Sequence, residues 1–245
     1  MDAIKKDQLE GKLRSFLAEG GLHKIFTPNA EIILAAQRDE AFKEVLNKGD
    51  LNIADGFGVV LVDRFLTRLD TNCVHQTVDR ITGVDTLELL CQIASDEGKS
   101  VLFYGAGPGV AEKAAEVMRK RHIGLKIEGI DPGQIADTIV PHSFLEQVSN
   151  IDILAVALGH GKQEHFICSA LNNAPGLKIA IGVGGALDYI SGNVQRAPVW
   201  MRNIGFEWLY RLIQQPERIG RIANAVIVFP LVVIWDRINR IKGEK

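Results

Sequence analysis

The stretch Val101-Leu102-Phe103-Tyr104-Gly105-Ala106-Gly107-Pro108-Gly109 decides the fold class of this 245-residue chain. Its apolar half predicts a buried strand, and its glycines predict a tight turn into a helix over residues 110–121. The same plan recurs on both sides of this stretch, with helices expected over 30–48 and 206–224 and strands at 25–26, 51–54, 151–157 and 178–181. Alternating strands and helices predict a Rossmann-like α/β fold, with mostly parallel sheets covered by helices.

Five loops are expected at the carboxyl edge of this sheet, at residues 27–29, 55–58, 105–109, 158–164 and 182–188. In such sheets ligands bind at this edge, where helix N-termini direct backbone N–H groups toward anions. Gly105 and Gly107 would let the backbone approach a phosphate closely. However, Val110 stands where the dinucleotide fingerprint has Gly or Ala, so a tight turn without a ligand is an equally good interpretation.

Composition excludes several classes of protein. A chain that is 47% hydrophobic is not disordered, and three widely spaced cysteines indicate reduced thiols in the cytoplasm rather than a disulfide scaffold or a zinc site. The charged N-terminus lacks the apolar segment of a signal peptide, so export is not expected. A net charge of −2 gives no reason to expect nucleic acid as a partner.

The charge is unevenly distributed along the chain. Residues 196–245 carry nine basic and four acidic residues, a net of +5, whereas residues 1–195 have a net of −7. We therefore expect an α/β domain over 1–195 and a C-terminal appendage over 196–245, called the tail below. The tail holds an apolar run over 222–235, whose fourteen residues are fewer than the roughly 20 that cross a bilayer. Flanking cations predict a helix lying in the lipid interface; a core helix docked on the domain is the alternative.

Several polar residues are candidates for chemistry. Asp55 ends a predicted strand and is placed to act as a general base, although an Asx turn or a helix cap would use the same residue. Thr27 or Asn29 equally suits an N-cap. Asp188, after the glycines at 182–185, is placed to accept a hydrogen bond from a ribose hydroxyl or a base N–H.

Three arginines of the tail are expected to share one helix face: Arg211, Arg218 and Arg221. Without paired acids they would clamp a diphosphate, and a solvated helix face is the alternative. No Asp-x-Asp pair ends a strand, so neither a metal nor another cofactor is expected.

Five segments in order resemble the WecG/TagA/CpsF glycosyltransferases (glycosyltransferase family 26). They are Thr27-Pro28-Asn29-Ala30-Glu31, Ala54-Asp55-Gly56-Phe57-Gly58-Val59-Val60, Arg80-Ile81-Thr82-Gly83-Val84-Asp85, Gly159-His160-Gly161-Lys162-Gln163-Glu164 and the run 182–216. Two departures stand out. The family often has Pro where this chain has Gly161, and a Gly-Tyr-Phe turn where it has Gly133-Gln134-Ile135.

The resemblance implies an inverting, metal-independent transferase that moves a sugar from a UDP-sugar to a polyprenyl-diphosphate-linked saccharide in cell-surface polysaccharide biosynthesis. It implies that Asp55 is the catalytic base, with Thr27 and Gln163 beside it, and that the tail arginines close over the diphosphate. The candidate substrate- or nucleotide-binding residues are Asn29, Arg80, Gly105, Gly107, Lys162, Gly184, Asp188, Arg211, Arg218 and Arg221.

The implied location is the cytoplasmic face of the bacterial inner membrane, as a peripheral protein. The sequence leaves the donor sugar open among N-acetylmannosamine, its uronic acid and another hexose. It also leaves the oligomeric state open, a homo-oligomer included. The alternative function is a soluble NAD- or nucleotide-binding Rossmann-like protein without glycosyl transfer, built on the turn at 105–109.

Overall fold

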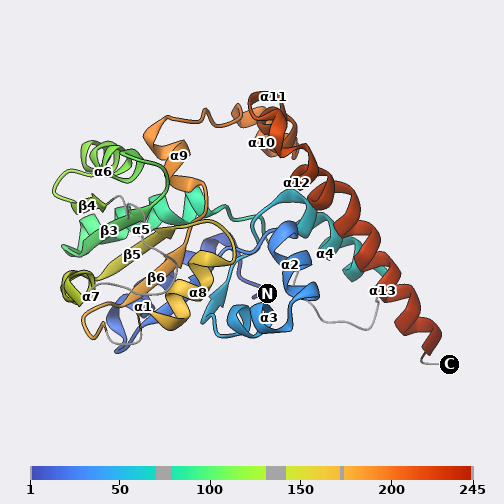
Figure 1. Ribbon diagram of the computed structural model, residues 1–245, viewed down its shortest axis with the longest axis horizontal. Helices are drawn as coiled ribbons and strands as arrows, with labels where there is room; N and C mark the ends of the chain where they lie inside the picture. Colours follow the sequence, from blue (N-terminus) through green and yellow to red (C-terminus); the bar gives the residue numbers. More distant parts are fainter. Residues whose placement is uncertain (1, 70–78, 131–141, 172–173, 244–245) are drawn as a thin grey trace.

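The computed structural model describes residues 2–69, 79–130, 142–171 and 174–243, and a six-stranded parallel sheet forms its core (Figure 1). The predicted Rossmann-like α/β fold is therefore confirmed, with all strands of the described residues in one sheet. Its order is β2-β1-β6-β5-β3-β4. The strands are β1 (His23–Phe26), β2 (Leu51–Asn52), β3 (Ser100–Gly105), β4 (Lys126–Ile130), β5 (Ile153–Ala157) and β6 (Ile179–Gly182).

Helices cover both faces of the sheet, because β-strand side chains alternate between the faces. In β3, Val101 and Phe103 pack in one apolar cluster, and Leu102 and Tyr104 pack in the other. The first cluster lies under α1 (Lys6–Ala18), α5 (Gly83–Glu97), α6 (Val110–Arg121) and α9 (Ala186–Ser191). The second lies under α3 (Glu40–Asn47), α7 (His142–Val148) and α8 (Lys162–Ser169).

The helix expected over 30–48 is two helices, α2 (Ala30–Arg38) and α3. Asp39 ends the first and begins the second, with its carboxylate accepting a hydrogen bond from the Phe42 N–H at 3.1 Å. A side chain that satisfies the first turn of a new helix competes with continuation of the old one, so the break forms at Asp39.

The tail is also broken into short helices, contrary to the single helix expected over 206–224. Residues 215 and 216 are Gln and Pro, and Pro216 opens a new turn where its missing N–H costs nothing. The segments are α10 (Val199–Asn203), α11 (Glu207–Gln214), η1 (Pro216–Arg218), α12 (Ile219–Ala223), a π-helical turn η2 (Asn224–Val228) and α13 (Phe229–Gly243).

A third apolar cluster attaches the tail to α2 and to α4 (Phe57–Leu69). Phe229 is 3% exposed and packs with Ala30 and Leu34 of α2 and with Val59 and Val60 of α4. Figure 1 shows α13 running alongside α2 and α4, away from the sheet. The apolar run of the tail therefore docks one face on α2 and α4, but only Phe229 of the run is buried, so the run is not a core helix.

The outer face of η2 and α13 remains apolar and exposed. Ile227, Leu231 and Trp235 are 58%, 61% and 69% exposed. Within the continuous helical segment Pro216–Asp236, 21 residues are long and apolar enough to cross a membrane by length and composition alone. The apolar run itself has fourteen residues, and the segment reaches 21 because the helical turns that precede the run continue into it.

Candidate functional site

A cavity of about 1370 Å³ lies at the carboxyl edge of the sheet. All five loops expected at this edge contribute to its wall, together with the tail. The loops predicted at this edge therefore do come together around one cavity. Of the candidate residues, the cavity is lined by Thr27, Asn29, Asp55, Lys162, Gln163, Gly184, Asp188, Arg211, Arg218 and Arg221.

Asp55 follows β2 and lies at the N-terminus of α5. Its Oδ2 atom accepts a hydrogen bond from the Gly83 N–H at 3.2 Å, and its own N–H donates to the Pro28 carbonyl at 3.1 Å. Burial raises the pKa of Asp55 to about 6, against the lowering effects of the Gly83 N–H and the Arg80 guanidinium. A carboxyl group with a pKa this close to neutrality is suited to proton transfer.

Thr27 and Asn29 both lie in the loop between β1 and α2, with different partners. The Asn29 side chain accepts a hydrogen bond from the Ile32 N–H at 3.0 Å and caps α2, as the cap interpretation expected. The buried Thr27 hydroxyl donates to the Gly182 carbonyl at 2.9 Å. Thr27 thereby ties the end of β1 to the end of β6, and both residues still reach the cavity wall.

Gln163 and Glu164 form a buried polar pair at the start of α8. Gln163 donates to Glu164 Oε1 at 2.8 Å and accepts from the Gly184 N–H at 3.0 Å. A Cβ atom at Gly182 would lie 2.8 Å from Gln163 Nε2, so the glycine makes room for this amide. Burial raises the pKa of Glu164. No role is predicted for Glu164 from the sequence, although the pair holds the loop that bears Gly184.

The departure at Gly161 has a structural reason. Gly161 has a φ of +81°, and its N–H donates to Glu164 Oε2 at 2.6 Å. A proline has no N–H to donate and holds φ near −65°, so this turn requires the residue that the chain has. The second departure, Gly133-Gln134-Ile135, lies outside the described residues.

The strand and turn around residues 105–109 contribute to the cavity wall, but not through the predicted Gly105 and Gly107. Tyr104 and Ala106 line the cavity, whereas Gly105 and Gly107 are not part of its wall. A Cβ atom at Gly105 would lie 2.8 Å from the Ala157 carbonyl oxygen, so this glycine serves the close packing of β3 against β5. Contact of either glycine with a phosphate stays a prediction.

The three tail arginines meet at the cavity from separate segments, α11, η1 and α12. Arg211 lies 5.2 Å from the centre of the Tyr189 ring. Burial and the neighbouring guanidiniums of Arg211 and Arg221 lower the pKa of Arg218. Among the described residues, neither Arg211 nor Arg218 has an acidic partner within ion-pair distance. Positive charge is thus concentrated on this wall, which suits an anionic ligand.

Arg221 differs from the other two arginines. Its Nε and Nη2 atoms donate to the two carboxylate oxygens of Glu31 on α2, at 2.7 and 2.9 Å. The expectation of three arginines without paired acids is therefore wrong for Arg221. The sequence could not show this pair, because 190 residues separate its members.

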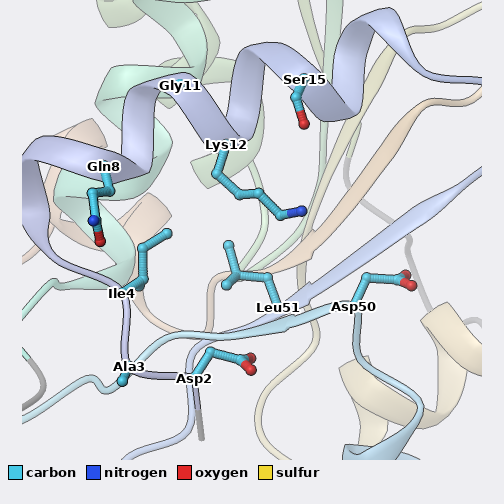
Figure 2. A pocket seen from close by; sticks show the side chains of 9 residues that line it. All are labelled: Asp2, Ala3, Ile4, Gln8, Gly11, Lys12, Ser15, Asp50 and Leu51. Atoms are coloured by element: carbon cyan, nitrogen blue, oxygen red, sulfur yellow. The ribbon is translucent and has the colours of Figure 1, made fainter. Parts of the chain in front are cut away.

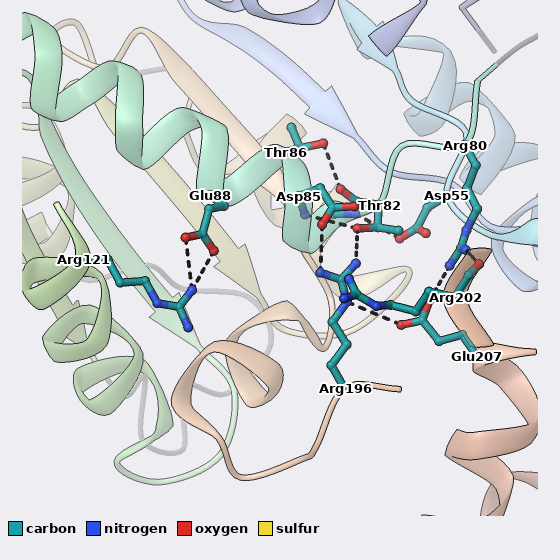
Figure 3. Close-up of polar contacts among 11 residues, drawn as sticks. Asp55, Arg80, Thr82, Asp85, Thr86, Glu88, Arg121, Arg196, Arg202 and Glu207 are labelled. Atoms are coloured by element: carbon teal, nitrogen blue, oxygen red, sulfur yellow. Dashed lines mark hydrogen bonds and ion pairs between the residues drawn. The ribbon is translucent and has the colours of Figure 1, made fainter. Parts of the chain in front are cut away.

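Arg80 lies beside the cavity rather than in its wall. Its Nη1 atom donates to the Arg202 carbonyl at 2.8 Å, and its Nη2 atom pairs with Glu207 Oε2 (Figure 3). Both terminal nitrogens therefore bind the tail. A contact between Arg80 and a substrate stays a prediction.

Asp188 and Lys162 extend the polar wall on either side of the glycines at 184–185. Asp188 lies in the first turn of α9, and Lys162 opens α8. Tyr189, which is not among the predicted site residues, adds an aromatic ring to the cavity wall next to Asp188. Its position after a glycine-rich strand end was the available signal.

A second hollow, near the N-terminus, does not offer comparable chemistry. Figure 2 shows Lys12 of α1 facing the loop that carries Asp2 and the segment Asp50–Leu51. The Asp2 carboxylate accepts from the Asn52 N–H at 2.6 Å, and the Asp50 carboxylate accepts from the Lys24 N–H at 2.7 Å. Both acids therefore bind backbone in this region, and the candidate site remains the cavity at the carboxyl edge.

Fold and cavity together define a class of protein. A parallel sheet whose carboxyl edge bears a partly buried carboxylate and a wall of guanidinium groups is suited to group transfer with an anionic substrate, as in α/β transferases. The sequence model of the glycosyl transferase WecG/TagA/CpsF family matches residues 1–243, so the chain belongs to this family and is a glycosyltransferase.

Three relatives carry one name, N-acetylglucosaminyldiphosphoundecaprenol N-acetyl-beta-D-mannosaminyltransferase. The relative from Bacillus subtilis (strain 168) is 31% identical over 241 residues, which are 98% of this chain and 87% of the relative. The relative from Bacillus spizizenii is 32% identical over 202 residues, 82% and 74% of the two chains. The relative from Staphylococcus aureus is 29% identical over 225 residues, 90% and 84% of the two chains.

Proposed function

We propose that this glycosyltransferase moves N-acetylmannosamine from a UDP donor to a saccharide carried on a polyprenyl diphosphate, in the synthesis of a cell-surface polymer. The donor sugar and the lipid-linked acceptor follow the name that the three relatives share. The observation that carries the proposal is the cavity, in which Asp55 lies on one side and Arg211, Arg218 and Arg221 approach from the tail.

In the proposed reaction, the Asp55 carboxylate accepts the proton of the acceptor hydroxyl. The hydroxyl oxygen forms a bond to the anomeric carbon while the bond from that carbon to the UDP oxygen breaks. Attack opposite to the departing diphosphate inverts the anomeric configuration. The tail arginines stabilise the negative charge that grows on the diphosphate. We therefore propose transfer without a metal ion.

A panel of donors tests this function. The full chain is incubated with UDP-N-acetylmannosamine, the corresponding UDP-uronic acid or a UDP-hexose. Each donor is paired with a polyprenyl-diphosphate-linked N-acetylglucosamine acceptor, and the mass of the lipid product is measured by mass spectrometry. We expect transfer from UDP-N-acetylmannosamine, in the presence of a chelator as well as in its absence. Tight NAD binding without transfer from any donor would instead support the soluble Rossmann-like alternative.

We propose further that the enzyme works on the cytoplasmic face of the bacterial inner membrane, with the tail docked on the bilayer. Exposed apolar side chains of α13 support this, and α4 adds a second row of them. Phe57, Leu61 and Phe65 recur every four residues on α4 and are 38%, 52% and 44% exposed. An apolar surface of this extent is typical of a membrane or protein contact.

Flotation with lipid vesicles tests the docking. The full chain is expected to float with vesicles that contain anionic phospholipid, because the tail has a net charge of +5. A chain that stays at the bottom of the gradient with every vesicle composition would contradict membrane docking while leaving the transfer chemistry open.

A further inference from the structure

Glu207, in the first turn of α11, is one of the residues through which the tail contacts the α/β domain. Its Oε2 atom pairs with Arg80, and its Oε1 atom lies 3.6 Å from Arg196 Nε (Figure 3). The Glu207 side chain is only 19% exposed, and those of Arg80 and Arg196 are 21% exposed. Charged groups in such a partly buried setting interact more strongly than on an open surface.

The same network continues to the N-terminus of α5. Arg196 donates to Asp85 Oδ1 at 2.8 Å and to Thr82 Oγ1 at 3.0 Å. The Thr82 hydroxyl also caps α5 by accepting from the Asp85 N–H at 3.1 Å. Gly83, the residue that follows Thr82, donates its N–H to Asp55 Oδ2 at 3.2 Å. A continuous set of polar contacts therefore leads from Glu207 to the turn that holds the Asp55 carboxylate.

Glu207 also sets the orientation of α11 relative to the cavity. Residues four apart on a helix lie on the same face, so Arg211 follows Glu207 one turn further along. Arg211 reaches the cavity wall next to Gly185, where a Cβ atom would lie 3.0 Å from Arg211 Nη2. Fixing Glu207 to Arg80 thus fixes the direction in which α11 presents Arg211.

We infer that Glu207 is a positioning residue that anchors α11 over the site, and that it both aims Arg211 at the cavity and keeps Arg80 from pairing with Asp55. The inference rests on the proposed function for its catalytic consequence. Glu207 itself is not in the cavity wall and acts through the two arginines.

The second role, keeping Arg80 from pairing with Asp55, follows from the charges around Asp55. The charged groups around Asp55 are Arg80, Glu207 and Asp85; Arg80 favours the ionised carboxylate, and the two acids disfavour it. Glu207 binds Arg80 Nη2, and the Arg202 carbonyl accepts from Nη1, so both ends of the guanidinium are already held by the tail. If the acid Glu207 is removed, Arg80 Nη2 loses its carboxylate partner, and Asp55, on which Arg80 already acts electrostatically, is the acid that we expect it to approach. An Asp55–Arg80 pair would make Asp55 a weaker base.

Three variants of the full chain test the inference: Glu207→Gln, Glu207→Asp and the control Glu217→Gln, which removes one exposed charge from the same tail. We expect Glu207→Gln to lower kcat/KM by about tenfold or more, the effect of losing a charge-assisted hydrogen bond. The acid limb of its pH–rate profile moves to lower pH, so the ratio of variant to wild-type activity is higher near about pH 5.5 than near about pH 8. Glu207→Asp restores the limb toward that of wild type, and Glu217→Gln leaves the profile unchanged.

A purely structural role for Glu207 would lower activity by the same factor at every pH, and that result would overturn the inference. Hydrogen–deuterium exchange of residues 207–214 gives a readout that needs no transfer activity. Faster exchange in Glu207→Gln than in Glu217→Gln supports the anchor even if no sugar is transferred by the wild type. Equal exchange in the two variants overturns the anchor, whatever the fate of the proposed function.

Discussion

The carboxylate of Asp55 accepts a hydrogen bond from the Gly83 N–H, at the N-terminus of α5. An N-terminal N–H and the helix dipole both favour the ionised carboxylate, whereas burial favours the protonated form. The balance leaves the pKa of Asp55 at about 6. The group is thus ionised at neutral pH and is still basic enough to accept a proton.

Replacing Asp55 by Asn is expected to reduce transfer by about 10²- to 10⁴-fold, the usual contribution of a well-placed general base. The amide is nearly isosteric, and its oxygen can still accept from Gly83. Donor binding should therefore be kept, and initial rates at saturating donor measure the loss. Full activity in Asp55→Asn would remove Asp55 from the catalytic role.

The protonation of Asp55 should also be visible in stability. Its pKa is raised from an ordinary 3.8 to about 6 in the folded chain, so the folded state binds the proton more tightly than the unfolded state. Stability from this group is present below about pH 4 and is lost as pH rises to about 6, by no more than about 3 kcal/mol.

Asp55→Asn removes this loss and is expected to unfold at a higher temperature than wild type at neutral pH, with little difference in acid. Thermal unfolding followed by circular dichroism across this pH range measures the difference. A stabilisation of equal size at every pH would show that Asp55 does not titrate in this window.

Arg218 and Arg221 differ in their counter-charges, and this difference gives a prediction for binding of the UDP diphosphate. Arg218 has no acidic partner among the described residues, so a diphosphate is its natural counter-charge. Arg218→Ala is expected to weaken UDP binding by about 10- to 100-fold, as measured by isothermal titration calorimetry.

The matched control is Glu31→Gln, which breaks the pair with Arg221 and leaves every guanidinium in place. It is expected to keep UDP binding at least as tight as in wild type, because Arg221 then has no competing carboxylate. Weaker binding in Glu31→Gln would show that the pair serves to hold the tail rather than to compete with the ligand.

The sequence predicted the fold well because the strands carry a strong local signal. Val101 to Tyr104 is apolar throughout, as expected of a strand that is buried on both faces. The boundaries that failed depend on single side chains: Asp39 divides one predicted helix, and Pro216 begins a new turn within another. Strand β4 was missed because Lys126 and Glu128 interrupt its apolar pattern at the sheet edge.

Residue type and position at a strand end brought Thr27, Asn29, Asp55 and Gln163 to the correct edge of the sheet. What the sequence could not give is pairing across long separations. Arg80 meets Glu207 across 127 residues, and Arg221 meets Glu31 across 190. Such pairs depend on where the tail docks, and no local pattern encodes that position.

The helical segment made of η2 and α13 has one packed face and one exposed face. Phe229 is buried against α2 and α4, and Phe229→Ala is expected to destabilise the chain by about 3–5 kcal/mol through the cavity that it leaves. Ile227 and Leu231 point outward, so the double change Ile227→Ser and Leu231→Ser should alter stability by no more than about 0.5 kcal/mol per site.

If the outer face enters a bilayer, the double variant loses about 1–3 kcal/mol per side chain of vesicle affinity. Flotation of that variant as efficient as that of wild type would show that this face does not contact lipid, and a change from dimer to monomer in light scattering would instead identify a second copy of the chain as its partner.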